Sequence, residues 1–155
     1  MNYPEYQADL QRIHESEVYG QAVFDTAARL TRNPERRAKW LALKALEAHT
    51  LQRYLDYMAS TGQTVLEPKG WAVKGRAEGA ALAVMPWRLA MTLVRNATRP
   101  FQEKFLRLKT HAQKQEQDFF AYVYAHEKAI EAFAKKELAR EPDSLKGVES
   151  LLRGK

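Results

Sequence analysis

The sequence has 155 residues, of which 45% are hydrophobic and 28% are charged, with a formal net charge of +6. These values predict a single globular domain over residues 1–155 and are not typical of a disordered chain. Because the chain contains no cysteine, disulfides, zinc–cysteine sites, iron–sulfur clusters and a cysteine nucleophile are excluded. The same absence favours a reducing, cytoplasmic setting.

The excess of positive charge does not predict a nucleic-acid partner. Basic residues alternate with acidic ones along the chain, and the densest basic group is Arg32, Arg36, Arg37 and Lys39. No zinc-finger, helix-turn-helix or aromatic RNA-binding motif accompanies this group. We therefore expect a solvated basic surface and no specific nucleic acid.

The first half of the chain predicts two long helices. Apolar residues recur at helical spacing over residues 4–30, where they are Tyr6, Leu10, Ile13, Phe24 and Ala28. Asn33 followed by Pro34 is a typical cap and first turn, so a second helix is expected over residues 34–60, before Thr61 and Gly62. The short turn between the two helices predicts that they are antiparallel.

A connecting loop is predicted over residues 61–76, which contain the helix breakers Gly62, Pro68, Gly70 and Gly75. A third helix is expected over residues 76–98, with Pro86 either kinking it or marking a restart. Residues 79–94 form the most apolar stretch, but this stretch is short of the roughly 20 residues that a spanning helix needs. It predicts a buried helix, with contact to a membrane surface as the alternative.

A fourth helix is predicted over residues 100–140. The apolar pattern lapses between Thr110 and Gln117, which leaves open whether this region is one helix or two. Pro142 ends the helix, and residues 141–155 are expected to form a polar tail. Together the four segments predict an all-α fold, a four-helix bundle.

Three glutamates are predicted to face the core of this bundle. On a helical wheel of about 100° per residue, Glu17 lies on the apolar side of its helix and Glu15 lies nearly opposite. Glu47 falls among Trp40, Leu43, Leu51, Tyr54 and Met58, while His49 points outward. Glu127 is at the centre of an apolar stripe, and His126 is predicted to lie at its edge. Buried carboxylates need a metal, a basic partner or shared protons, so a common site of Glu17, Glu47 and Glu127 is expected.

This arrangement resembles the ferritin-like superfamily of di-iron carboxylate proteins, particularly rubrerythrins and demethoxyubiquinone hydroxylases. The segment from Glu17 to Phe24 is similar to their first helix. Glu47-Ala48-His49-Thr50 and Glu127-Lys128-Ala129-Ile130 occupy the places of their two Glu-x-x-His motifs. The resemblance implies a ferritin-like bundle, bound iron or manganese and oxidoreductase activity.

The sequence departs from the family pattern at three positions. Thr50 and Ile130 replace the two motif histidines, and no acidic residue between Glu78 and Glu103 supplies the glutamate of the third helix. The resemblance therefore implies a degenerate site with Glu17, Glu47 and Glu127 as its metal ligands.

This site has two interpretations. In the first, the three carboxylates hold one hard divalent cation, and His14, about 60° from Glu17 on the wheel, is an auxiliary ligand. In the second, no cofactor is bound, and Arg88 or Arg95 neutralises a relict site.

The sequence leaves three functions open. The protein is a metal-binding relative of di-iron oxidoreductases, a non-catalytic binding or assembly protein, or a peripheral membrane protein that acts on a hydrophobic substrate through residues 79–94. A homodimer is expected by analogy with ferritin-like bundles. The sequence alone does not decide whether the chain is an enzyme.

Overall fold

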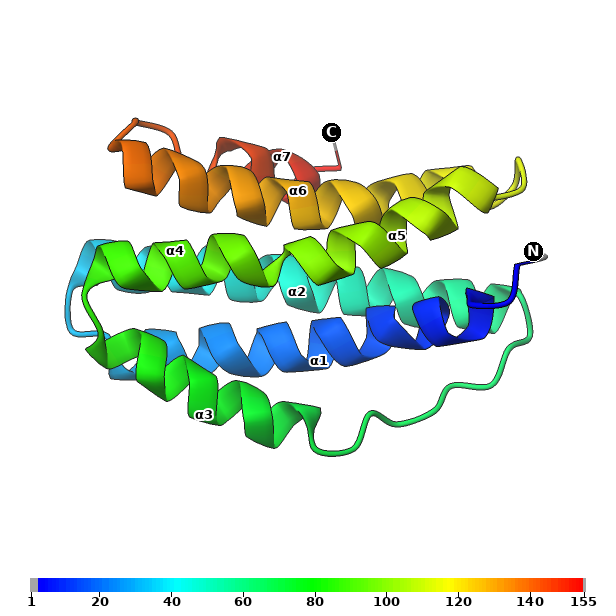
Figure 1. The fold of residues 1–155 in the computed structure, drawn as a ribbon, viewed down its shortest axis with the longest axis horizontal. Coiled ribbons are helices and arrows are strands. Elements are labelled where there is room, and N and C mark those ends of the chain that lie inside the picture. The colour runs from blue at the N-terminus through cyan, green and yellow to red at the C-terminus, as the bar shows by residue number, and fades with distance from the viewer. Residues whose placement is uncertain (1–2, 155) are drawn as a thin grey trace.

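The computed structural model describes residues 3–154, and regular secondary structure in this range is exclusively helical (Figure 1). The all-α prediction is therefore confirmed. The helices within the described residues are α1 (Tyr6–Leu30), α2 (Pro34–Ser60), α3 (Trp71–Val84), α4 (Trp87–Ala97), α5 (Arg99–His111), α6 (Gln117–Ala139) and α7 (Lys146–Leu152).

The α1–α2 hairpin follows the sequence prediction closely. The side chain of Asn33 caps α2 by accepting a hydrogen bond from the backbone N–H of Arg36 at 3.0 Å, and Pro34 occupies the first turn. Gly62, with a φ of 67°, follows the end of α2 in the left-handed conformation that glycine adopts readily. The two helices pack against each other along the molecule.

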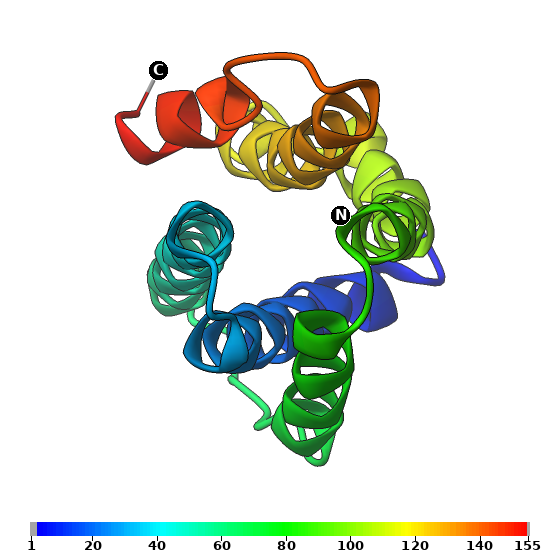
Figure 2. The same cartoon turned by 90° about the vertical axis from the view of Figure 1, so that its left-hand side faces the viewer.

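The other side of the bundle consists of α6 and the consecutive helices α4 and α5. Helix α6 contacts both α4 and α5, and it also contacts α2 and α7 (Figure 2). The predicted lapse in the pattern near residue 110 is a real break, because α5 ends at His111 and α6 begins at Gln117. Residues 100–140 therefore form two helices.

The connection from α2 to α4 runs back along the whole bundle. It consists of the loop over residues 61–70 and helix α3, which packs on the outer side of α1 (Figures 1 and 2). Because of this crossover, α2 and the α4–α5 pair run in the same direction, and α1 and α6 run in the opposite one.

Helix α3 begins earlier than the sequence predicted. It starts at Trp71, after Gly70 with a φ of 81°, whereas the prediction placed its start at residue 76. Gly75 was predicted to be a breaker, but it lies inside the helix and is buried together with Gly79. The reason is packing: a Cβ at either position would overlap the α1 backbone, at the carbonyl oxygens of Tyr19 and Val23 respectively.

Pro86 marks a restart, one of the two predicted alternatives, because α3 ends at Val84 and α4 begins at Trp87. The C-terminal segment differs from the prediction. The predicted polar tail contains α7, whose Val148 is fully buried against the bundle. Leu145, Leu151 and Leu152 of the same segment also pack against the core.

The apolar core consists of two clusters with a polar layer between them. One cluster includes Phe24, Trp40, Met91 and Phe133, and the other includes Ile13, Tyr54, Phe105 and Phe120. Along α1, α2 and α6, the residues between the two clusters include buried Glu17, Glu47, His126 and Glu127. The middle of the bundle therefore contains an ionisable layer.

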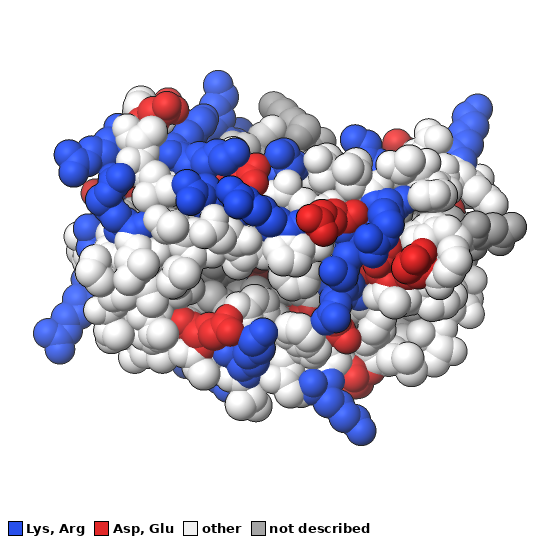
Figure 3. Space-filling model, in the orientation of Figure 1, with Lys and Arg blue, Asp and Glu red and all other residues white. Residues whose placement is uncertain are grey.

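The visible surface mixes blue and red side chains, as the interspersed charges predicted (Figure 3). Among the described residues, no helix is long and apolar enough to cross a membrane. Three apolar side chains near the α3–α4 turn are nevertheless exposed, namely those of Val84, Leu89 and Leu93.

Candidate metal centre

The three predicted glutamates come together in the structure. Glu17 is fully buried on α1, Glu47 lies opposite it on α2, and Glu127 is supplied by α6. The charges of Glu47 and Glu127 act on the ionisation of Glu17, and the charge of Glu47 acts on that of Glu127. The helical wheel thus predicted the core-facing acids correctly.

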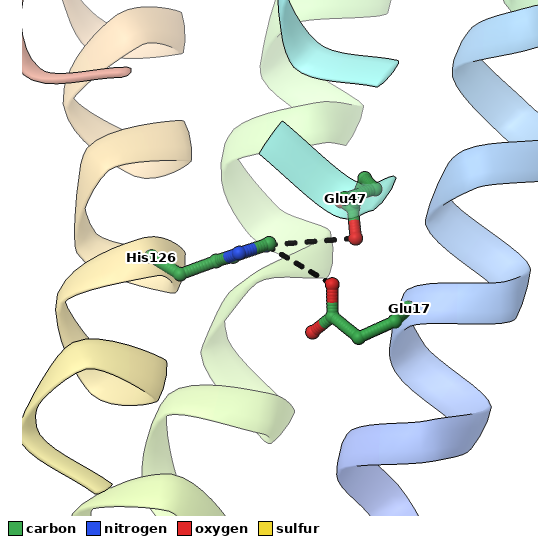
Figure 4. A group of neighbouring side chains, drawn as sticks. All are labelled: Glu17, Glu47 and His126. Carbon is green, nitrogen blue, oxygen red and sulfur yellow. Dashed lines mark ion pairs between the residues drawn. The ribbon is translucent and has the colours of Figure 1, made fainter. Parts of the chain in front are cut away.

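The structure adds a fourth member, His126, that the wheel placed at the edge of α6. Its side chain is completely buried, and its Nε2 lies 3.7 Å from Glu17 Oε2, 3.5 Å from Glu47 Oε2 and 3.9 Å from Glu127 Oε1. Figure 4 shows His126 from α6 pointing between Glu17 and Glu47. The prediction for His126 was therefore wrong.

The reason is that α6 buries two neighbouring stripes. The wheel identified the stripe of Phe120, Val123, Glu127, Ile130 and Ala134. A second buried stripe repeats at heptad spacing, through Phe119, Tyr122, His126, Ala129 and Phe133. It is buried because α6 contacts α2, α4, α5 and α7. The aromatic residues seven positions before and after His126 are the sequence signal that pointed to it.

Three of the four side chains provide a compact set of ligand atoms. One atom each from Glu17, Glu47 and His126 lies within 4.8 Å of the others. Both carboxylate oxygens of Glu17, Oε2 of Glu47 and Nε2 of His126 are buried and have no hydrogen-bond partner in the described structure. Buried polar atoms are normally satisfied, so a group of unsatisfied atoms that face one another fits a bound cation.

Burial and mutual repulsion shift the ionisation of the group. Burial, reinforced by the charges of Glu47 and Glu127, raises the pKa of Glu17 well above its usual range. Burial likewise raises the pKa of Glu127 to about 8, although His126 opposes the shift. Burial alone would lower the pKa of His126, but Glu47 and Glu127 outweigh it, so this pKa is raised. Without a cation, the site therefore retains protons at neutral pH.

Neighbouring side chains orient His126 and Glu127. The Nδ1 of His126 is 2.6 Å from the hydroxyl of Thr50, and this hydroxyl is 3.0 Å from that of Tyr122. The hydroxyl of Ser16 donates a hydrogen bond of 3.3 Å to Glu127. When the Nδ1–H of His126 donates to Thr50, Nε2 presents its lone pair to the carboxylates. Thr50 on α2 thus supports a histidine from another helix, α6.

Gly20 makes room for the group. A Cβ at this position would overlap the Cδ and both oxygens of Glu47. Because Gly20 is one turn after Glu17 on α1, the absence of its side chain allows the Glu47 carboxylate to approach Glu17. The role of this glycine was not predicted from the sequence.

The predicted auxiliary residues lie apart from the group. His14 is buried, and its ring packs against Tyr54 at 5.1 Å between centroids, outside the set of ligand atoms. Arg88 is exposed and donates to the backbone carbonyl of Leu138, and Arg95 donates to Asn96. Neither arginine forms a described ion pair with the glutamates, because both side chains are engaged near the surface; the basic side chain that approaches the glutamates is His126.

His49 also differs from its prediction. It is half-buried rather than fully outward, and its Nδ1 is 2.6 Å from the hydroxyl of Tyr122. At the junction between α4 and α5, the side chain of Thr98 is buried. The hydroxyl of Thr98 donates to the carbonyl of Arg95, so it is already satisfied locally.

Comparisons with protein-family models, with curated proteins and with solved structures found no match. Inference about the function of the chain therefore rests on its own residues and their geometry.

Proposed function

We propose that the protein holds one iron or manganese ion in the middle of its bundle, with Glu17, Glu47 and His126 as ligands and Glu127 beside them. The observation that carries this proposal is the set of buried ligand atoms that face one another without hydrogen-bond partners. Placing four ionisable groups in a core is costly unless a cation or shared protons compensate for them.

The chemistry of the donors favours these two metals. Carboxylate oxygens suit hard cations such as Mn²⁺, and imidazole nitrogen suits iron. The absence of cysteine removes the thiolate ligands that favour structural zinc. With three ionised carboxylates and a neutral imidazole, the site and a divalent ion together would carry a single net negative charge. With a trivalent ion, the net charge would be zero.

The path of the chain supports a relationship to ferritin-like bundles. Such bundles have one long crossover between their second and third helices, and here the crossover consists of residues 61–70 and α3. The acidic ligands come from the first, second and last long helices, as the resemblance in the sequence implies. The donor set is smaller than that of a di-iron protein, so we propose a single ion.

We further propose that the bound ion supports an oxidation with O₂ or peroxide, the chemistry that iron or manganese would supply in such a site. The residues of the chain hold the ligands in place and exclude water. Without the ion, burial raises the pKa of Glu127 to about 8, so its carboxyl group is suited to hold a proton until the ion binds.

Metal analysis of purified protein tests the proposal. Protein from cultures supplemented with iron or manganese should contain about one ion per chain, because the ligands are already assembled. The Glu47→Gln variant should lose most of this metal, since it loses a charged ligand while its size is preserved.

Glu15→Gln is the matched control. Glu15 is on the same helix as Glu17 but forms a surface ion pair with Arg12 at 2.7 Å, so its substitution should leave the metal content unchanged. Equal metal content in wild type and Glu47→Gln would overturn the proposal. A metal-free wild type that Glu47→Gln stabilises would instead indicate a cluster held by shared protons.

A further inference from the structure

A cavity of about 360 Å³ lies between α1, α3 and α4. Its walls include the side chains of Val23, Leu82, Met85, Leu93 and Val94. In Figure 3 the surface between α3 and α4 is mostly uncharged and is hollowed there. A cavity of this size and lining is typical of a site for a small apolar molecule.

The cavity adjoins the candidate metal centre through Gly20. This residue lines the cavity, and the carboxylate of Glu47 fills the space on which its Cβ would lie. Because Gly20 has no side chain, none lies between the cavity and Glu47 at this position. A molecule in the cavity would therefore be separated from a proposed ligand by little more than the α1 backbone.

The cavity owes its shape to the way α3 is attached. Gly75 and Gly79 bring the α3 backbone directly against α1. Farther along, the larger side chains of Leu82 in α3 and of Met85, directly after α3, line the cavity instead. The close contact at the glycines fixes α3, and the cavity lies between its second half and α4.

One polar pair faces the otherwise apolar lining. The hydroxyl of Tyr19 donates a hydrogen bond to Glu78 Oε2, and Lys74 approaches the other oxygen of Glu78 at 3.8 Å. The Glu78 carboxylate has acceptor capacity beyond these contacts. A ligand that matches the cavity would be apolar over most of its surface and would offer one hydrogen-bond donor to Glu78.

We propose that this cavity binds a small apolar molecule with one hydroxyl group and holds it across Gly20 from Glu47, as the substrate of the proposed metal centre. The substrate role rests on the function proposed above, whereas binding in the cavity does not. The exposed Val84, Leu89 and Leu93 lie near the α3–α4 turn and offer an apolar approach to the cavity.

Titration with 1-naphthol, followed by its fluorescence polarisation, tests binding. Wild-type protein should bind 1-naphthol and should bind naphthalene, which lacks the hydroxyl, up to about tenfold more weakly because one hydrogen bond is lost. Ala81 lines the cavity, so Ala81→Phe should fill it and weaken 1-naphthol binding at least about tenfold.

Ala77→Phe is the control for this variant. Ala77 is exposed on the same helix but does not line the cavity, and helical side chains lean toward the N-terminus, away from it. This variant should bind 1-naphthol as wild type does. Equal binding by the Ala81→Phe variant, or equal affinity for naphthalene, would overturn the proposed site.

Protein loaded with Co²⁺ tests the link to the metal centre. Saturation with 1-naphthol should change the visible absorption of the bound cobalt in wild type, and the change should be absent in Ala81→Phe. Binding of 1-naphthol that leaves the cobalt spectrum unchanged would overturn the substrate role. Binding of 1-naphthol by protein that takes up no cobalt would refute the metal centre but support the cavity site.

Discussion

Gly20 controls how closely two acidic side chains approach each other. It lies three residues after Glu17 on α1, and the Glu47 carboxylate fills the space of its absent side chain. Glycine inside a helix costs roughly 1 kcal/mol relative to alanine. The contact with Glu47 explains why this cost is tolerated at the middle of a 25-residue helix.

Gly20→Ala should therefore weaken metal binding while leaving the helix intact. The new methyl group would push the Glu47 carboxylate away from Glu17, and we expect the affinity for Mn²⁺ to fall about 10–100-fold, the range typical when the support of a ligand is lost. Competition with a chelator of known affinity measures the change.

Gly147→Ala provides the control, because a Cβ there would meet only Ala129 at an ordinary 3.8 Å. This variant should bind Mn²⁺ with wild-type affinity. Unchanged affinity in Gly20→Ala would show that the position of the Glu47 carboxylate does not matter for the metal.

Helix α3 is attached to the bundle differently from the other helices. Its buried residues are Gly75 and Gly79, whereas α2 and α6 bury large apolar side chains. Close backbone contact at two glycines one turn apart replaces the usual interlocking side chains. The stability of α3 thus depends on a close backbone contact with α1 that has no room for a side chain at these two positions.

Gly79→Val should loosen α3 without unfolding the bundle. A branched side chain would collide with the backbone of Val23, and overpacking of this kind costs about 1–3 kcal/mol. Hydrogen exchange should become faster in residues 71–84 while α2 and α6 remain protected. Ala77→Val, at an exposed position on the same helix, should show no such change, and uniform acceleration in all helices would contradict the local role of Gly79.

The whole molecule has a polar layer between two apolar clusters. Without a metal, this layer makes the stability of the bundle depend on pH. Folding raises the pKa of Glu17, Glu127 and His126, so the folded state binds more protons than the unfolded state above about pH 4.5. The contribution of these three groups to stability then falls as the pH rises toward 8.

In metal-free protein, we expect the free energy of unfolding to fall by about 2–4 kcal/mol between pH 5 and pH 8. Urea unfolding in the presence of a chelator measures it. The carboxylates whose pKa is lowered, such as Glu131 and Glu137, lose their stabilising effect only below pH 5, outside this range. Glu127→Gln should flatten the curve, and bound Mn²⁺ should reverse its slope because protons compete with the metal. A metal-free stability that is constant or rises from pH 5 to pH 8 would contradict the proposed ionisation.

Local signals in the sequence predicted most of the helices. Asn33 and Pro34 placed the start of α2, Pro86 separated α3 from α4, and the lapse after Thr110 marked the end of α5. Gly75 misled the prediction because glycine breaks a helix in one context and permits close helix packing in another. The difference lies in the neighbour, α1, which the local sequence does not specify.

Periodicity by itself determined that Glu17, Glu47 and Glu127 face the core, because one apolar stripe fixes the orientation of a helix. Only the tertiary structure decided what they meet there. His126 joins them because α6 is covered by neighbours on more than one side. Arg88 and Arg95 do not join them, because their side chains are engaged near the surface. Glu47 reaches Glu17 because Gly20 leaves room. Each of these contacts depends on which helices are neighbours. The hydrophobic periodicity of one helix does not specify which helices pack against it.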